Sequence, residues 1–218
     1  MNEGNLLVDR LAACYSGAVY DVLRAMGLRD QVLPHEIRGL RREVRTAGPA
    51  FTMQGALQAD LSEHETLLRW TEFLSAAPSG SVVICQPNDD TLAHMGELSA
   101  ETLQVRGIRG YVVDGGCRDS DFILGRGFPV FCRYLTPKDI VGRWAPTELG
   151  APVGIGGVTI RTGDLVLADA DGVVAIPAEH GEKIVEAAEV LMRTESALRR
   201  ALVAGEDPRE AYLSYGVF

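Results

Sequence analysis

The stretch GYVVDGGCRDSD, residues 110–121, carries the residues of this chain that are best suited to chemistry. An apolar run, residues 111–113, is followed by Asp114, by two glycines and by the pair Arg118-Asp119, after which a helical run begins. This pattern predicts a strand, a glycine turn and a helix start. In open α/β sheets, ligands bind at the carboxyl ends of the strands, and glycines there let the backbone approach a ligand closely.

The Arg118-Asp119 pair offers two kinds of contact to a ligand. Arg118 can hold a carboxylate in bidentate fashion, and Asp119 can hold a hard divalent cation whose other positions are filled by water. Taken alone, such a pair is more often a helix N-cap and its surface partner. A second stretch that is expected at the same edge of the sheet favours the interpretation of the pair as part of a ligand-binding site.

That second stretch is GELS, residues 96–99, which lies one helix and one strand before Arg118. Gly96 begins a predicted helix, residues 96–106, whose first N–H groups are free to attract an anion. An anion-binding turn, an arginine and a metal-binding carboxylate together suit a small 2-oxo acid. Metal chelation by the carboxylate and keto oxygens of such an acid helps to break the adjacent C–C bond.

The elements around these stretches predict an α/β fold. Residues 81–134 read as strand, helix, strand, helix, strand, which is typical of a parallel sheet covered by helices. Residues 151–177 are rich in glycine and β-branched residues and predict an antiparallel β section, so the glycines within GIGG at 154–157 are not expected to form a phosphate loop. Residues 179–218 predict a long amphipathic helix and a short one.

A further amphipathic helix is predicted over residues 60–74. The apolar residues that we expect to face the core are Leu61, Leu67, Leu68 and Phe73.

Composition narrows the classes of function. Hydrophobic residues make up 46% of the 218 residues, and the net charge of −9 argues against a nucleic-acid-binding surface. The four cysteines have no CxxC spacing and are expected to be reduced thiols of a cytoplasmic protein rather than zinc ligands. Neither a membrane-spanning run of about 18 apolar residues nor a signal peptide is predicted.

These motifs resemble those of the RraA-like family, which includes 4-hydroxy-4-methyl-2-oxoglutarate aldolases and regulators of RNase activity. The resemblance is carried by GELSA at 96–100, RG at 106–107 and GYVVDGGCRD at 110–119, with weaker matches further along. It implies one RraA-like domain over residues 1–218: a swivelling β/α/β-type domain with a central parallel or mixed sheet, an antiparallel β section and C-terminal helices. The helical tail, about 179–218, is expected at a subunit interface of a homotrimer or hexamer.

The enzymes of this family are class II aldolases that use Mg²⁺ or Mn²⁺, release pyruvate from 4-hydroxy-2-oxo acids and in many cases decarboxylate oxaloacetate. The resemblance therefore implies a metal-dependent carbon–carbon lyase acting on a small 2-oxo acid. It assigns substrate binding to Gly96, Glu97, Leu98, Ser99 and Arg118, the metal to Asp119, and catalysis to Arg118, Glu97 and Glu195. Glu195 is expected to act from the C-terminal helix of a neighbouring subunit.

Two alternatives to this aldolase remain open. A regulator of the RNase-regulator type would keep the scaffold without turnover, and Asp121 is an acid where that branch carries one. A related oxo-acid lyase with a different substrate would share the site but differ around residues 60–74 and 86–94. A Schiff-base aldolase is disfavoured, because Lys138 lies in a predicted turn and Lys183 on the polar face of a predicted helix.

Three further residues are each open to two interpretations. Cys117 is adjacent to Arg118 and could be an activated thiol, although no histidine is near it in the sequence. Asp114 could carry a proton or form the turn. His94 could touch a ligand or stabilise the loop that precedes Gly96.

Overall fold

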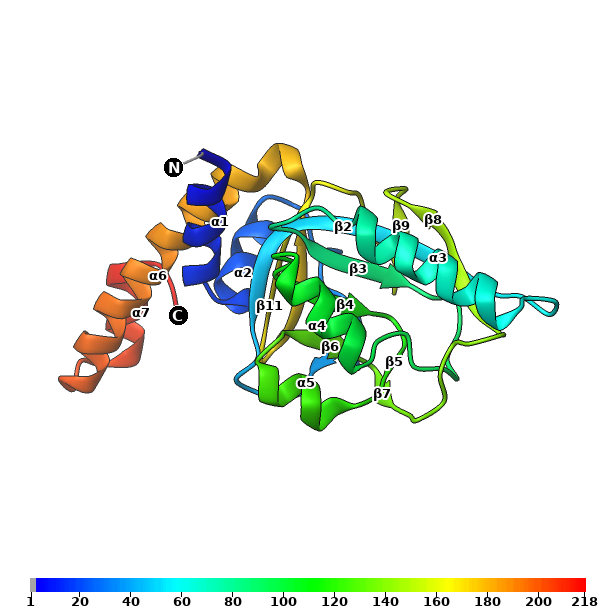
Figure 1. The fold of residues 1–218 in the computed structure, drawn as a ribbon. Coiled ribbons are helices and arrows are strands. Elements are labelled where there is room, and N and C mark those ends of the chain that lie inside the picture. Colours follow the sequence, from blue (N-terminus) through cyan, green and yellow to red (C-terminus); the bar gives the residue numbers. More distant parts are fainter. Residues whose placement is uncertain (1–2) are drawn as a thin grey trace.

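The computed structural model describes residues 3–218, and a mixed sheet of eight strands lies at its centre (Figure 1). Its middle is parallel, as predicted. The parallel strands, in spatial order, are β6 (Val130–Cys132), β4 (Gly110–Val113), β3 (Val82–Gln86) and β2 (Thr46–Leu57). Helix α4 (Glu97–Val105) connects β3 to β4, and α5 (Ser120–Arg126) lies between β4 and β6. This repeated strand–helix–strand unit places the GELS and Arg-Asp stretches at the same edge of the sheet.

The remaining strands pair mostly antiparallel and nearly close the sheet. On one side of the parallel unit, β1 (Arg38–Gly39) pairs with β6. On the other side, β11 (Leu165–Asp169) pairs with β2 and with β12 (Gly172–Ile176), and β8 (Trp144–Leu149) pairs with the second half of β2.

Two small ladders complete the β structure. Strands β9 (Val153–Ile155) and β10 (Val158–Ile160) form a hairpin through Gly156 and Gly157, so no helix follows the glycine run. Strands β5 (Gly116–Cys117) and β7 (Tyr134–Leu135) form a short parallel pair.

Apolar cores lie on both faces of the parallel strands, which explains why these strands are apolar without alternation. Along β3, Val83 and Cys85 pack under α3 (Glu63–Ala76), α4 and α5, whereas Val82 and Ile84 face the β9–β12 strands. A third core lies between β11–β12 and three helices, which are α1 (Glu3–Ala13), α2 (Ser16–Ala25) and α6 (Gly181–Val203).

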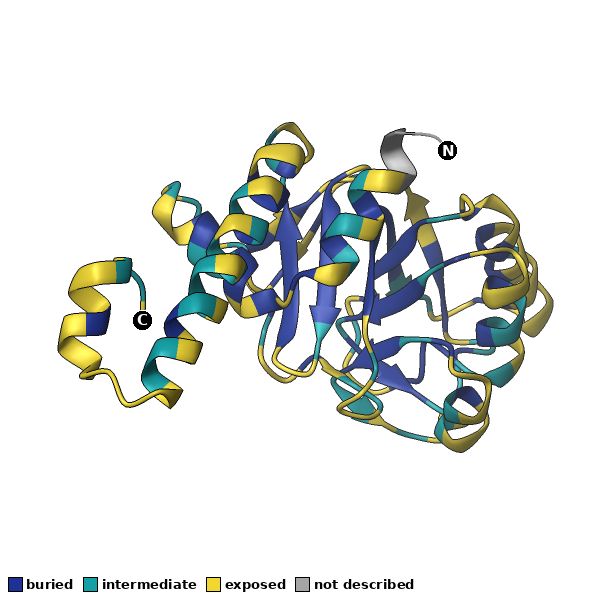
Figure 2. Ribbon diagram, turned by 90° about the vertical axis from the view of Figure 1, so that its left-hand side faces the viewer, coloured by how far each residue is buried: buried dark blue, intermediate teal, exposed yellow. Residues whose placement is uncertain are grey.

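The C-terminal helices extend away from the sheet. After a short 3₁₀ turn, η1 (Ala178–His180), α6 packs against α2 through its first half, and α7 (Pro208–Tyr215) folds back on the second half of α6. Figure 2 shows that α7 and the outer half of α6 are largely exposed. No helix within residues 3–218 is long and apolar enough to cross a membrane.

The prediction for α3 was right about the helix and wrong about part of its buried face. Leu61 and Phe73 are buried, but Leu67 and Leu68 are half exposed. The face is set by Thr66, Trp70, Phe73 and Leu74, which recur at spacings of three and four. The large indole of Trp70 fills the space over the sheet, so Leu68 is left facing solvent and Leu67 lies at the rim of the pocket described below.

Candidate active site

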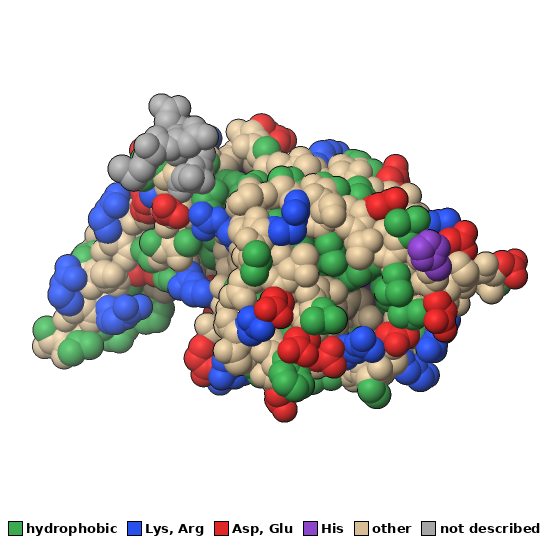
Figure 3. Space-filling model, viewed as in Figure 1, with side chains coloured by type: hydrophobic (Ala, Val, Ile, Leu, Met, Phe, Trp, Pro, Cys, Tyr) green, Lys and Arg blue, Asp and Glu red, His purple; other side chains and the backbone are tan. Residues whose placement is uncertain are grey.

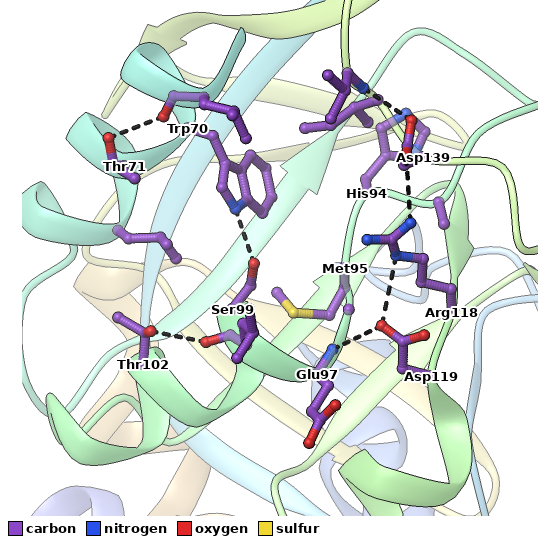
Figure 4. Close-up of a pocket in the computed structure, with 17 residues that line it drawn as sticks. Trp70, Thr71, His94, Met95, Glu97, Ser99, Thr102, Arg118, Asp119 and Asp139 are labelled. Carbon is purple, nitrogen blue, oxygen red and sulfur yellow. Dashed lines mark hydrogen bonds and ion pairs between the residues drawn. The ribbon is translucent and has the colours of Figure 1, made fainter. Parts of the chain in front are cut away.

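The structure brings the Arg118-Asp119 pair against the start of α4, as the sequence predicted (Figure 4). The backbone N–H of Arg118 donates to the Met95 carbonyl at 2.9 Å, which fixes the strand-end turn against the loop before α4. The Asp119 Oδ2 atom accepts from the Glu97 N–H at 3.1 Å and lies 3.4 Å from the Arg118 Nε atom.

A glycine is required at position 96 because the side chains of Arg118 and Asp119 come close to its backbone. A Cβ atom at Gly96 would lie 2.8 Å from the Asp119 Oδ2 atom and 3.2 Å from the Arg118 Nε atom. Asp119 itself has a left-handed backbone with φ 55°, a conformation that Asp and Asn adopt more readily than other non-glycine residues. Both features hold the carboxylate at the entrance to the pocket.

The first turn of α4 presents N–H groups at this point. The N–H of Glu97 is used by Asp119, whereas the N–H groups of Leu98 and Ser99 have no acceptor inside the helix. The Ser99 hydroxyl accepts from the Trp70 indole at 2.8 Å, which ties α4 to α3. The Glu97 carboxylate points away from the Arg118 guanidinium (Figure 4).

A pocket of about 460 Å³ opens beside these groups, between α3, the start of α4 and the segment before β8. Arg118, Asp119 and Asp139 line one wall, and side chains of α3 and α4 line the opposite wall. The volume is within the range of small-molecule sites. Figure 3 shows acidic and basic side chains interspersed on this face of the molecule, over α4 and α5, rather than a basic patch.

Asp139 is a site residue that the sequence reasoning missed. Its Oδ2 atom lies 3.3 Å from an Arg118 terminal nitrogen, and its Oδ1 atom accepts from the Val141 N–H at 3.1 Å. Arg118 is thus held between two carboxylates. The only signal in the sequence was an acid in the Thr-Pro-Lys-Asp turn, twenty residues after the motif.

His94 lines the pocket and also packs within the loop that precedes Gly96, so a contact with a ligand stays a prediction beside its structural role. Its Nε2 atom lies 3.2 Å from Asp89 Oδ2, and its ring packs edge-on against Trp144 at 4.9 Å. The contact with Asp89 is not aligned as a hydrogen bond, and neither ring nitrogen has a hydrogen-bond partner within residues 3–218. Burial lowers the pKa of His94 to about 4, although Asp89 opposes the shift, so the ring is neutral near pH 7.

Asp114 and Cys117 have structural roles. Asp114 accepts from the Arg133 guanidinium and from the Gln86 amide, on the side of the strand ends away from the pocket. The Cys117 thiol is buried, and its hydrogen bond to Cys132, followed by burial, raises its pKa far above the usual range, so it is not an activated nucleophile. All four cysteines are buried and free, as expected.

Glu195 does not reach the pocket within one chain. It lies on α6, which projects from the sheet on the side away from α3 (Figure 1), and its carboxylate accepts from the Tyr15 hydroxyl. Burial, followed by this hydrogen bond, raises the pKa of Tyr15 to about 12. The catalytic role predicted for Glu195 therefore depends on a second copy of the chain.

One carboxylate oxygen on the pocket wall is available to a hard divalent cation. Asp119 Oδ1 has no hydrogen-bond partner in the described part of the chain, and it belongs to a partly exposed carboxylate on the pocket wall. Mg²⁺ is commonly bound by one or two carboxylates, with water and substrate oxygens filling the other positions. Within residues 3–218, no group of three or more His, Cys, Asp or Glu side chains could hold a metal, so a site made of protein ligands alone is not present there.

The fold and the strand-end motifs define a family. The model of the RraA-like family, described as Aldolase/RraA, matches residues 16–175. The chain belongs to the RraA-like family.

Two curated relatives and two solved structures show the range of this family. A protein of Halalkalibacterium halodurans named "Putative 4-hydroxy-4-methyl-2-oxoglutarate aldolase" is 32% identical over 83% of this chain and 83% of its own length. Protein DlpA of Legionella pneumophila is 28% identical over 94% of this chain, and the chain spans about a third (34%) of the length of that protein.

Among solved structures, an uncharacterised protein from Pseudomonas syringae superimposes with a TM-score of 0.88 at 25% identity, over 97% of this chain and 94% of its own. Streptomyces coelicolor RraAS2, described as an unusual member of the RNase ES inhibitor RraA protein family, superimposes with a TM-score of 0.81 at 28% identity, over 89% and 97%. The family thus contains both proteins named as aldolases and proteins named as RNase inhibitors.

Proposed function

We propose that this protein is a divalent-metal-dependent lyase that cleaves a 4-hydroxy-2-oxo acid, such as 4-hydroxy-4-methyl-2-oxoglutarate, to pyruvate, with oxaloacetate decarboxylation as a side activity. The observation that carries this proposal is the convergence of Arg118, Asp119 and the free N–H groups of α4 on one pocket. The Halalkalibacterium relative, whose name describes that reaction, supports it.

The reaction defines what the pocket must stabilise. The C4 hydroxyl gives up its proton and becomes a carbonyl, the C3–C4 bond breaks, and the electron pair passes to C3, where the enolate of pyruvate later takes up a proton. Negative charge therefore develops on the 2-oxo oxygen. When bound at Asp119, Mg²⁺ or Mn²⁺ supplies a Lewis acid for that oxygen and a template for the oxo acid.

The residues of the chain supply orientation and charge. Arg118, held between Asp119 and Asp139, is positioned to bind the substrate carboxylate or the developing oxyanion. The N–H groups of Leu98 and Ser99 donate to the same oxygens.

Three carboxylates are candidates for accepting the C4 hydroxyl proton. Asp139 lies on the pocket wall beside Arg118, and Glu97 lies at the rim with its carboxylate turned away. Glu195 becomes a candidate only if a second copy presents its α6 helix. Within one chain the geometry favours Asp139 as the acceptor of this proton. A small rotation of the Glu97 side chain would bring its carboxylate into the pocket as well.

The test is pyruvate release coupled to lactate dehydrogenase. 4-Hydroxy-4-methyl-2-oxoglutarate and oxaloacetate are supplied with Mg²⁺ or Mn²⁺, and again with a chelator. Chelator-sensitive pyruvate from the hydroxy acid is expected. Absence of pyruvate from both substrates, with metal binding demonstrated by calorimetry, would contradict the proposal.

The same proposal covers assembly and location. The chain is expected to act as one domain, residues 1–218, in a cytoplasmic homotrimer or hexamer. Large apolar side chains at the C-terminal end are strongly exposed, at 83% for Val203 and 80% for Phe218, and a subunit interface would cover them. A monomeric mass by light scattering would contradict this assembly.

A regulator without turnover is the second candidate. The similarity to RraAS2, described as a member of an RNase inhibitor family, and the net charge of −9 support a protein partner with a basic surface. Pyruvate release separates the two candidates, because a regulator of this kind needs neither Asp119 nor a metal.

A further inference from the structure

The pocket has two unlike walls. One wall carries the charged groups described above. The opposite wall and rim are formed by apolar side chains from α3 and α4, which are Leu67, Trp70, Leu74 and Leu98. Ile140 and Val141, which follow Asp139 in the chain, add further apolar surface to the pocket. Figure 4 shows the Trp70 indole and α3 facing the Arg118 side across the open space.

The apolar wall is held in place by its own contacts. The Trp70 indole N–H donates to the Ser99 hydroxyl at 2.8 Å, and its ring packs on Phe73 at 5.0 Å and on Trp144 at 6.1 Å. Because Ser99 also belongs to the first turn of α4, the position of the apolar wall is tied to the N–H groups that would hold the oxo-acid head. A substrate bound at the head therefore extends its C4 substituent towards a fixed hydrocarbon surface.

The charges in the pocket are unfavourable for a second substrate carboxylate. Arg118 is the one cationic side chain among the described residues that line the pocket, against the carboxylates of Glu97, Asp119 and Asp139, so the formal sum is +1 − 3 = −2. A divalent cation would bring that sum to zero. After the head carboxylate has engaged Arg118, a second carboxylate would have no cationic partner among the described residues that line the pocket.

The neighbouring Arg69 and Arg143 do not belong to the pocket lining. Arg69 on α3 donates to Gln58 at 3.1 Å, on the side of α3 away from the pocket lining. Arg143 lies 3.8 Å from the Asp139 Oδ1 atom and does not line the pocket. The buried His94 ring is neutral near pH 7 and so adds no positive charge.

We propose that the substrate of this site is a monocarboxylic 4-hydroxy-2-oxo acid whose C4 carries an uncharged, mainly hydrocarbon substituent, which packs between Trp70 and Leu67. This rests on the proposed lyase function and narrows it, because among 4-hydroxy-2-oxo acids it favours a substrate with one carboxylate over the diacid named above, which the site would cleave less efficiently. Each methylene buried on the apolar wall is expected to improve binding about fourfold.

The test compares two non-cleavable ligands that differ only in the tail. 2-Oxohexanoate and 2-oxoglutarate share the oxo-acid head, and their dissociation constants are measured by calorimetry with Mg²⁺ present. We expect 2-oxohexanoate to bind at least about tenfold more tightly. Leu67→Arg, a change at a half-exposed rim position, is expected to reverse the preference, whereas Val105→Arg at the exposed end of α4, outside the pocket lining, leaves it unchanged.

A kinetic arm separates this inference from the proposed function. Pyruvate release is compared for 4-hydroxy-4-methyl-2-oxohexanoate and 4-hydroxy-4-methyl-2-oxoglutarate, and the higher kcat/KM is expected for the former. An equal or higher kcat/KM for the diacid, together with tighter binding of 2-oxoglutarate, would overturn the proposed preference for a hydrocarbon substituent. The release of pyruvate would still support the lyase function. Failure of both oxo acids to bind would overturn both.

Discussion

Two arginine–aspartate clusters can be compared, and only one of them faces a pocket. Asp114 and Arg133 follow strands β4 and β6 of the central sheet, whereas Arg118 and Asp119 follow the short strand β5. Arg133 donates to Asp114 Oδ1, and Gln86 donates to Asp114 Oδ2 at 2.9 Å. The side chains of Arg133 and Asp114 are 28% and 13% exposed. Those of Arg118 and Asp119 are 39% and 38% exposed, with 3.4 Å between Nε and Oδ2.

The difference lies in free bonding capacity rather than in residue type. Both oxygens of Asp114 are occupied by partners from adjacent strand ends, so this cluster holds β3, β4 and β6 in register. Asp119 keeps one oxygen without a hydrogen-bond partner within residues 3–218, and Arg118 makes only long contacts to two carboxylates. A saturated cluster stabilises the fold, whereas an unsaturated one beside a cavity can bind a ligand.

Replacing the aspartate of the unsaturated cluster gives the largest expected effect. Asp119→Asn keeps an oxygen for the Glu97 N–H and tolerates the left-handed backbone, but it removes the charge that would bind the metal. We expect kcat/KM for pyruvate release to fall by about 1,000-fold or more, because metal and electrostatic stabilisation supply several kcal/mol of the barrier reduction. The free energy of unfolding should change by less than about 1 kcal/mol. Full activity in this variant would remove Asp119 from the mechanism.

The same substitution in the saturated cluster is expected to do the opposite. Asp114→Asn removes a charged acceptor from Arg133 and leaves a less favourable amide opposite Gln86. We expect the free energy of unfolding, measured with urea, to fall by about 2 kcal/mol, since hydrogen bonds to charged groups contribute about that much. The kcat/KM of the remaining folded protein should stay within about threefold of the wild-type value. A selective loss of activity without loss of stability would show that Asp114 takes part in the reaction.

Sequence reasoning located the unsaturated cluster because its parts are close together along the chain. Gly96 and the Arg118-Asp119 pair each follow a strand of one strand–helix–strand unit, so topology alone brings them to one edge. The same reasoning could not separate the two clusters, because Arg133 follows a different strand and its pairing with Asp114 depends on the sheet order β6-β4-β3.

The opposite wall of the pocket was the part that could not be predicted. Period counting assigned Leu67 and Leu68 to the core, but the volume of Trp70 decides which face of α3 packs on the sheet. Asp139 enters from a loop after β7, and nothing in the local pattern links that loop to Arg118. Contacts of this kind depend on side-chain packing between distant segments, which spacing does not encode.

His94 lies between the two clusters, and the effect expected from it appears only as the pH falls below neutrality. It lines the pocket on one side, and a Cβ atom at Gly115, beside Asp114, would lie only 2.7 Å from its Nδ1 atom. Because burial lowers its pKa to about 4, the unfolded chain, whose histidine titrates near 6.5, binds the proton first as the pH falls. The stability that depends on neutral His94 is therefore fully present above about pH 6.5 and is lost as the pH falls towards 4.

As the pH falls from 7 to 5, protonation of His94 in the unfolded chain should lower the free energy of unfolding by about 2 kcal/mol. His94→Phe retains a ring that can pack on Trp144 but cannot titrate, so urea unfolding of this variant should depend less steeply on pH, by that same amount. Equal pH dependence in the two proteins would mean that the folded state accepts the proton on His94 as readily as the unfolded chain does. Asp89, whose Oδ2 atom lies 3.2 Å from the His94 Nε2 atom, would then stabilise the imidazolium in the folded protein. A protonated His94 would place a positive charge on the pocket lining, so the residue would be grouped with the ligand-binding cluster rather than with the structural one.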